Sequence, residues 1–116
     1  MEVKKSVGLS KKDVVRASIA VNTCDKVKET PLTMVGCIFY DKEEVNNETG
    51  EITKVNVVGI KTKDEEFYTS ISPTIKESLD SIINVYSEEE VTQGIDIIIK
   101  SHKSNSNREF LVVDLV

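Results

Sequence analysis

Residues 99–110, IKSHKSNSNREF, combine side chains that bind anions with side chains that stack on flat rings. Lysine and arginine pair with phosphates, and aromatic faces hold unpaired bases. The chain as a whole is acidic, with a formal net charge of -5. A basic, polar turn in an acidic chain therefore indicates a local contact surface rather than general attraction to anions.

Similar residues recur on neighbouring segments. Lys54, Lys61 and Lys63 lie near the two ends of the apolar segment 52–63, and Tyr68 lies at the start of the next apolar segment. A phenol needs a wet or hydrogen-bonded environment, so Tyr40 and Tyr68 are the better stacking candidates beside Phe39 and Phe67. The candidate nucleic-acid-binding set is Tyr40, Lys54, Lys61, Lys63, Tyr68, Lys100, His102, Lys103, Arg108 and Phe110.

A structural interpretation competes with this set. The chain has only three Tyr and three Phe, and most aromatics in apolar strands belong to a core. Lysines on exposed strand faces usually serve solubility and protect sheet edges. The group at residues 100–108 is the stronger candidate, because it coincides with a turn rich in Ser and Asn.

Covalent and metal chemistry have no support in the sequence. His102 lacks a patterned Cys, Ser or carboxylate partner, and no Walker, HExxH or GxSxG motif occurs. Cys24 and Cys37 with one distant histidine do not form a zinc-ligand spacing. We expect no enzyme activity, no catalytic residue, no metal and no cofactor. Both cysteines are interpreted as small buried hydrophobes, with a disulfide as the minor alternative.

Composition predicts one folded domain. The 116 residues are 39% hydrophobic and 30% charged, and single cores usually occupy roughly 100–150 residues. No apolar run reaches the roughly 18 residues that span a bilayer, and MEVKKSVGLSKKDVV lacks an apolar signal core. We therefore expect a cytoplasmic protein that makes no contact with membranes.

Five segments are predicted strands. They are 32–41, 52–63, 67–71, 95–103 and 108–116, separated by turn-forming residues at 46–51, 64–66 and 104–107. The first is almost continuously apolar, which indicates burial on both faces for part of its length. Gly36 within it predicts a bulge or sharp bend.

Two helices are predicted. SKKD at residues 10–13 has the Ser and acid spacing of a capping box, with Leu9, Val14, Val15 and Ile19 as its apolar stripe. A short strand is the alternative there, because β-branched residues lower helix propensity. The second helix starts after Ser72 or Thr74, with Ile75, Leu79, Ile82 and Tyr86 on one face. The acidic stretches 41–51, 64–66 and 87–90 are expected to be loops.

The predicted order is that of a mainly β OB-fold, a five-stranded barrel with one helix between strands three and four. A short N-terminal helix precedes it. We expect a single OB-fold domain over residues 1–116, with an N-terminal extension at 1–30 and the barrel at 31–116. A small α+β sheet with the same linear order is the alternative.

Residues 32–116 resemble a known family in the order of their predicted elements and in the residue types within them. The matching features are GCIFYDKEE, then VNVVGIKTKDEEFYTSISPT leading into IKESLDSIINVY, and the final hairpin IIIKSHKSNSNREFLVVDLV. Together they resemble the small single-stranded DNA-binding proteins of phages and mobile elements of Gram-positive bacteria. The resemblance implies an OB-fold that binds single strands without strict sequence preference.

Two functional hypotheses follow. The first is a non-enzymatic protein that binds single-stranded DNA, or RNA as a second option, in phage or mobile-element replication, recombination or transfer. The second is an acidic protein-binding module or an inhibitor that mimics nucleic acid, which requires its carboxylates on one continuous face. A homo-oligomer is also open, through the apolar C-terminal strand or the N-terminal helix.

Overall fold

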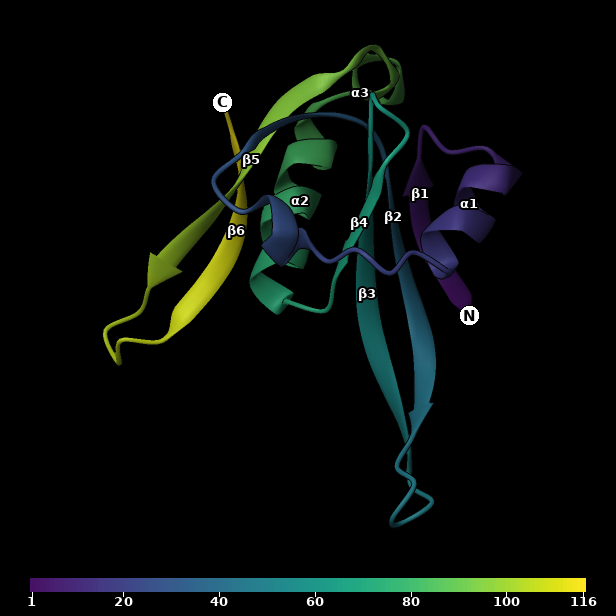
Figure 1. The fold of residues 1–116 in the computed structure, drawn as a ribbon. Helices are drawn as coiled ribbons and strands as arrows, with labels where there is room; N and C mark the ends of the chain where they lie inside the picture. The colour runs from purple at the N-terminus through teal and green to yellow at the C-terminus, as the bar shows by residue number, and fades with distance from the viewer.

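The computed structural model describes residues 1–116 as strands with a few helices packed on them (Figure 1). The elements are β1 (Glu2–Val7), α1 (Lys11–Ser18), the 3-10 helix η1 (Cys24–Val27), β2 (Pro31–Val45), β3 (Ile52–Thr62), β4 (Phe67–Ser70), α2 (Pro73–Val85), α3 (Glu88–Gln93), β5 (Ile95–Lys103) and β6 (Glu109–Leu115). All five predicted strands and both predicted helices are present.

The long strand β2 organises a six-stranded antiparallel sheet, in which five strands follow the order β4-β3-β2-β5-β6 and β1 pairs with β2 beside this path. Its first residues, Pro31–Met34, pair with β5, and residues 37–41 pair with β1, while β3 pairs along the other edge. The register shifts between Met34 and Gly36, so the bulge predicted at Gly36 is confirmed. A Cβ at Gly36 would lie 2.5 Å from Leu9 Cδ2 and 3.0 Å from the Val7 carbonyl oxygen, so a side chain here would displace Leu9.

The predicted closed barrel is wrong. The strands form an open sheet, because no ladder joins β4 to β6. Helix α2 bonds to β6 instead: Thr74 Oγ1 donates to the Leu111 carbonyl, and Ser78 Oγ accepts from Val113 N–H at 2.8 Å. These hydroxyls bond backbone groups of β6 that would otherwise be free to pair with another strand and close a barrel.

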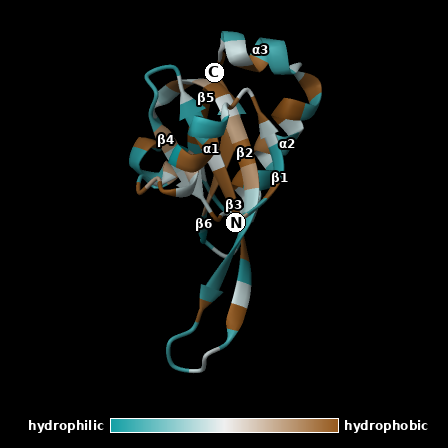
Figure 2. Ribbon diagram, turned by 90° about the vertical axis from the view of Figure 1, so that its right-hand side faces the viewer, coloured by the Kyte–Doolittle hydropathy of each residue, from teal (hydrophilic) through white to brown (hydrophobic).

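The sheet is covered on both faces of β2 and β3. The main core, between the sheet and α2, includes Phe39, Ile60 and Leu79. A smaller core on the other face consists of Ala17, Ile38, Tyr40, Val57 and Phe67, with α1 above it. Figure 2 shows the apolar residues along the central strand β2. Burial on both faces explains why β2 is nearly continuously apolar in sequence.

The helix starts follow local capping chemistry. Ser10 and Asp13 form the predicted capping box of α1, so the strand alternative is wrong there. Its predicted apolar stripe is only partly correct, because Val15 and Ile19 are exposed. Ser72 caps α2, and Pro73 is its first residue. None of the helices combines the length and the hydropathy of a membrane-spanning segment.

Three elements were missed: the 3-10 helix η1, strand β1 and helix α3. Strand β1 has the polar sequence EVKKSV, and it pairs with β2 from Glu2↔Asp41 to Val7↔Cys37. Residues 87–90 were expected to form a loop, but Ser87 and Glu90 make a capping box that starts α3. The S-x-x-E spacing was the available signal for α3.

Two hairpins extend from the body. One is the β2–β3 arm, residues 41–54, which projects farthest from the body in Figure 1. The other is the β5–β6 hairpin, residues 100–110, which lies on the far side of α2. The arm holds five of its seven charges as Asp or Glu, whereas the hairpin contains Lys100, Lys103 and Arg108.

Candidate nucleic-acid interface

The β5–β6 hairpin places a ring pair on its outward face. Ile97 and Ile99 of β5 are buried in the main core, so the alternate residues Lys100 and His102 face away from it. His102 pairs across the ladder with Phe110, and the two rings stack with centroids 5.7 Å apart and planes 27° from parallel. The pair forms a small aromatic surface outside the core.

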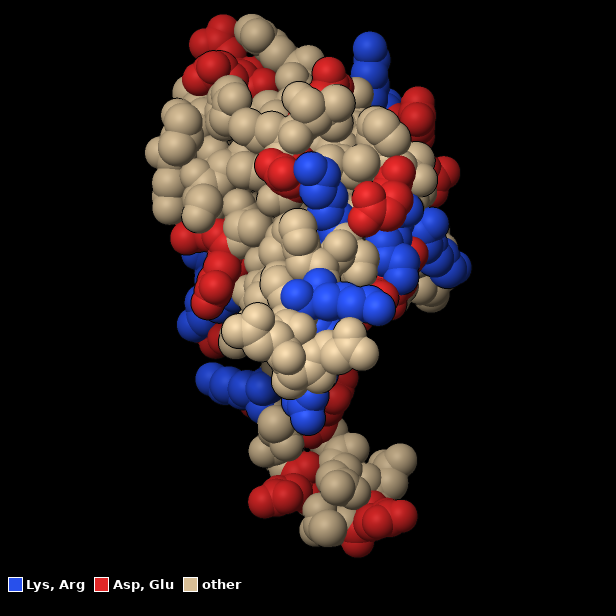
Figure 3. Space-filling model, turned by 90° about the vertical axis from the view of Figure 1, so that its left-hand side faces the viewer, with Lys and Arg blue, Asp and Glu red and all other residues tan.

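Basic side chains surround this ring pair. Lys103 and Arg108 have no carboxylate within 4.0 Å, whereas Lys100 Nζ lies 3.0 Å from Asp114 Oδ2. That ion pair is exposed and lowers the pKa of Asp114, but exposed pairs contribute little free energy. Figure 3 shows Lys and Arg side chains across the middle of this face and acidic side chains on the arm below.

The base of the hairpin is anchored by the segment around η1. Glu29 Oε1 accepts a hydrogen bond from Ser101 N–H at 2.8 Å, and Glu29 N–H donates to the Ile99 carbonyl. Lys28 Nζ lies 3.0 Å from Glu109 Oε1 and lowers the pKa of that carboxyl. Lys28 therefore adds a fourth cation near the hairpin, and it is not among the residues predicted from the sequence.

The tip of the hairpin closes on its own polar groups. Ser104 N–H donates to the Arg108 carbonyl, and Ser104 Oγ lies 2.9 Å from Ser106 Oγ. Asn107 has a φ of 63°, a left-handed conformation that asparagine tolerates better than most residues. The predicted turn at 104–107 is confirmed. Lys103 ends β5 on one side of this turn, and Arg108 lies just before β6 on the other side.

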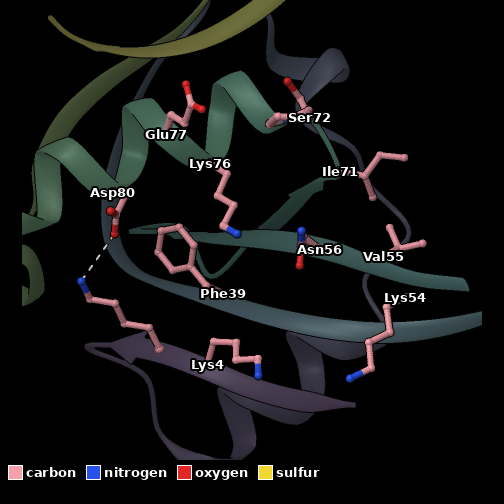
Figure 4. Close-up of a pocket in the computed structure, with 12 residues that line it drawn as sticks. Lys4, Phe39, Lys54, Val55, Asn56, Ile71, Ser72, Lys76, Glu77 and Asp80 are labelled. Atoms are coloured by element: carbon pink, nitrogen blue, oxygen red, sulfur yellow. Dashed lines mark hydrogen bonds and ion pairs between the residues drawn. The ribbon is translucent and has the colours of Figure 1, made fainter.

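Lys54 lies on a different surface. It lines a groove of about 640 Å³ between β1, β3 and the start of α2, together with Lys4, Lys5 and Lys76. Figure 4 shows Lys76 and Lys4 on either side of Phe39 and Lys54 farther along the strand. The other three lysines could not be selected from the sequence, because β1 was not predicted and the groove joins residues far apart in the chain.

Lys61 and Lys63 are separated from both surfaces. Lys61 Nζ lies 3.1 Å from both carboxylate oxygens of Asp13 and is mostly buried. Lys63 is exposed in the turn between β3 and β4, where its N–H donates to the Thr33 carbonyl.

The two candidate tyrosines lie on the sheet under its covering layers. Tyr40 is only 5% exposed in the smaller core, and burial raises the pKa of its phenol. Tyr68 is half-buried against the main core. Five of the ten candidate residues come together, and these are Lys100, His102, Lys103, Arg108 and Phe110 on the β5–β6 hairpin.

The acidic residues do not form one continuous face. The β2–β3 arm and α3 lie at opposite ends of the molecule in Figure 1, and both are rich in glutamate. No group of three or more His, Cys, Asp or Glu side chains is arranged to hold a metal ion. The clustering that a nucleic-acid mimic needs is therefore not observed.

A family model described as "Phage Single-stranded DNA-binding protein" matches residues 20–116, which is most of the chain. No curated protein and no solved structure matches the chain.

Proposed function

The chain belongs to the phage single-stranded DNA-binding protein family, whose members bind DNA without enzymatic activity, and from this premise we propose that the β5–β6 hairpin is its DNA-binding surface. The single observation that supports this surface is the stacked pair of His102 and Phe110 beside unpaired Lys103 and Arg108. Cations and exposed rings are the two requirements for binding a single strand.

The proposed binding mode uses no base-specific hydrogen bonds. The phosphates pair with Lys100, Lys103 and Arg108, and an unpaired base stacks on the ring of Phe110 or His102. Every base has a flat face, so such binding is largely independent of sequence. The ion pair between Lys100 and Asp114 opens at little cost, because both side chains are exposed.

The distribution of charge also favours placing the bound DNA on the β5–β6 hairpin. Glutamates of the β2–β3 arm and α3 repel phosphates from both ends of the molecule, and the hairpin lies between those ends (Figure 1). We propose that the protein protects single-stranded DNA during phage or mobile-element replication, recombination or transfer in the cytoplasm of the host.

Residues 1–116 are proposed to act as one binding unit. The N-terminal segment pairs with the sheet through β1 and covers one face of it through α1. Self-association is a separate proposal, supported by the exposed Leu115 and Val116 at the end of β6. Light scattering tests it, and a mass equal to one chain would exclude an oligomer.

Fluorescence anisotropy of a labelled oligo-dT, titrated with the protein at low and moderate salt, tests the proposed function. A duplex and an RNA of equal length serve as comparison ligands. We expect tight, salt-sensitive binding that favours the single strand. Absence of binding even at low salt would overturn the proposal, and the RNA titration decides which nucleic acid is preferred.

A further inference from the structure

Four lysines from three separate elements line one groove. Lys4 and Lys5 come from β1, Lys54 from β3 and Lys76 from the first turns of α2. Its volume of about 640 Å³ falls within the roughly 300–1,000 Å³ typical of small-molecule sites. We call this feature the lysine groove. Nothing in the proposed hairpin surface accounts for it.

The four lysines differ in their partners. Lys5 Nζ bonds to Asn84 at 3.2 Å and lies 3.5 Å from Asp80, which ties β1 to α2. Figure 4 shows this ion pair across one end of the groove. Lys4 lies 2.7 Å from Glu2. Lys54 and Lys76 have no carboxylate within 4.0 Å, so both ammonium groups are available to an incoming anion.

The remaining lining residues include the carboxylates of Glu77 and Asp80, but the apolar and amide side chains among them suit a ring attached to that anion. Phe39, Val55 and Ile71 are the three apolar residues of the groove, and Ile71 is strongly exposed. The Asn56 side chain, drawn beside them in Figure 4, supplies an amide donor and acceptor. An apolar surface, an amide and two unpaired cations match the base and the flanking phosphates of one nucleotide unit.

The groove also adjoins the hairpin. Ser72 and Pro73 line it, and Ser72 Oγ lies 2.9 Å from Thr74 Oγ1. Thr74 Oγ1 in turn bonds to the carbonyl of Leu111, which follows Phe110 in β6. The start of α2 therefore links the rim of the groove to the strand that bears the stacking ring.

We propose that the lysine groove is a second subsite for the bound strand, holding one nucleotide unit by Lys54, Lys76 and its apolar floor. This proposal rests on the proposed function of the hairpin and extends it. Lys54 and Lys76 each pair with one of the phosphates that flank this nucleotide, and the base lies against the exposed side chain of Ile71.

The first test compares two double variants in oligo-dT anisotropy across a fourfold range of salt. Lys54→Gln with Lys76→Gln removes two cations from the groove, and Lys11→Gln with Lys12→Gln removes two exposed cations from α1. Each phosphate contact contributes about 0.7 to the logarithmic salt slope, so the groove variant should lower the slope by about 1.4. The ratio of the affinity at the lowest salt to the affinity at the highest salt should therefore be about sevenfold smaller for the groove variant than for the wild type. Equal effects of the two variants would overturn the subsite.

The second test does not depend on a variant. The side-chain amide of Asn56 lies in the groove and is absent from the hairpin, so its NMR signals report on the groove alone. They should shift when unlabelled oligo-dT is added to the wild-type protein. If the protein binds oligo-dT while these signals stay unchanged, the subsite is wrong and the hairpin surface stands. If the protein binds no oligo-dT at all, both proposals fail.

Discussion

Lys61 Nζ lies 3.1 Å from both carboxylate oxygens of Asp13, and this ion pair joins β3 to α1. The two side chains are only 17% and 8% exposed. Asp13 Oδ2 also accepts the N–H of Ser10 at 3.0 Å, as part of the capping box. One carboxylate therefore starts the helix and holds it against the sheet, and Lys61 is occupied by this structural role.

Replacing Lys61 by Met should destabilise the fold. The substitution leaves the Asp13 carboxylate largely buried without its cation, and breaking a buried pair in this way typically costs about 3 kcal/mol. Urea unfolding measures the change. The control is Lys63→Met at an exposed position, which should alter the free energy of unfolding by less than about 0.5 kcal/mol. Equal stability of the two variants would show that the pair contributes nothing.

The same pair predicts a dependence of stability on acid pH. Burial by itself raises the pKa of Asp13, but hydrogen bonds from Ser10 and Lys61 outweigh burial and hold the pKa below its ordinary value. An unfolded aspartate titrates near about 3.9, so the stabilisation is complete above about pH 4 and is lost as the pH falls through the lower folded pKa.

Asp13→Asn removes that titration. The free energy of unfolding of the wild type should therefore fall more steeply than that of Asp13→Asn below about pH 4. Urea titrations at several pH values measure both slopes. Parallel pH profiles would contradict the assignment of the shifted carboxyl to Asp13.

Sequence reasoning succeeded where structure depends on neighbouring residues. The spacing of Ser10 and Asp13 is enough to start α1, and Ser72 with Pro73 is enough to start α2. Hairpin pairing is also local, because His102 and Phe110 are brought together by a short turn. The hairpin part of the candidate site was therefore predictable from one contiguous stretch.

The rest depends on contacts between distant residues. The polar strand β1 forms because β2 has a free edge to pair with, and its own sequence gives no alternating apolar pattern. The alternation of side chains along β2 did not reveal that Tyr40 is buried, because α1 covers the face of the sheet on which Tyr40 lies. The predicted barrel does not close, because hydroxyls of α2 bond to the edge of β6. The apolar periodicity of a helix gives no sign of such bonds.

Phe110 should contribute to binding through its ring. Phe110→Leu keeps an apolar side chain in β6 but removes the aromatic face, and base stacking is worth about 1–3 kcal/mol per base. We expect weaker oligo-dT binding with an unchanged salt slope, because no phosphate contact is lost. Tyr86→Leu, which removes another half-buried ring at the end of α2, is the control. A similar loss in both variants would argue against stacking at Phe110.

Cys24 and Cys37 should react slowly with thiol reagents in the folded protein. Both thiols are free and buried, as the sequence analysis predicted, and burial raises the pKa of each to about 12. The reactive thiolate is then scarce at pH 8. Labelling with a chromogenic disulfide should be slow in buffer and fast in urea. Rapid labelling of two thiols in buffer would contradict this burial.

The most direct test of the proposed surface compares two triple charge reversals of equal size. Lys100→Glu, Lys103→Glu and Arg108→Glu alter the hairpin, and Lys11→Glu, Lys12→Glu and Arg16→Glu alter exposed positions of α1. Oligo-dT anisotropy across a salt series should show that the hairpin variant binds far more weakly, with a salt slope lower by about 2. The α1 variant should keep nearly the wild-type slope. Unchanged binding by the hairpin variant, or an equal loss in the α1 variant, would contradict the assignment of the DNA-binding surface to the β5–β6 hairpin.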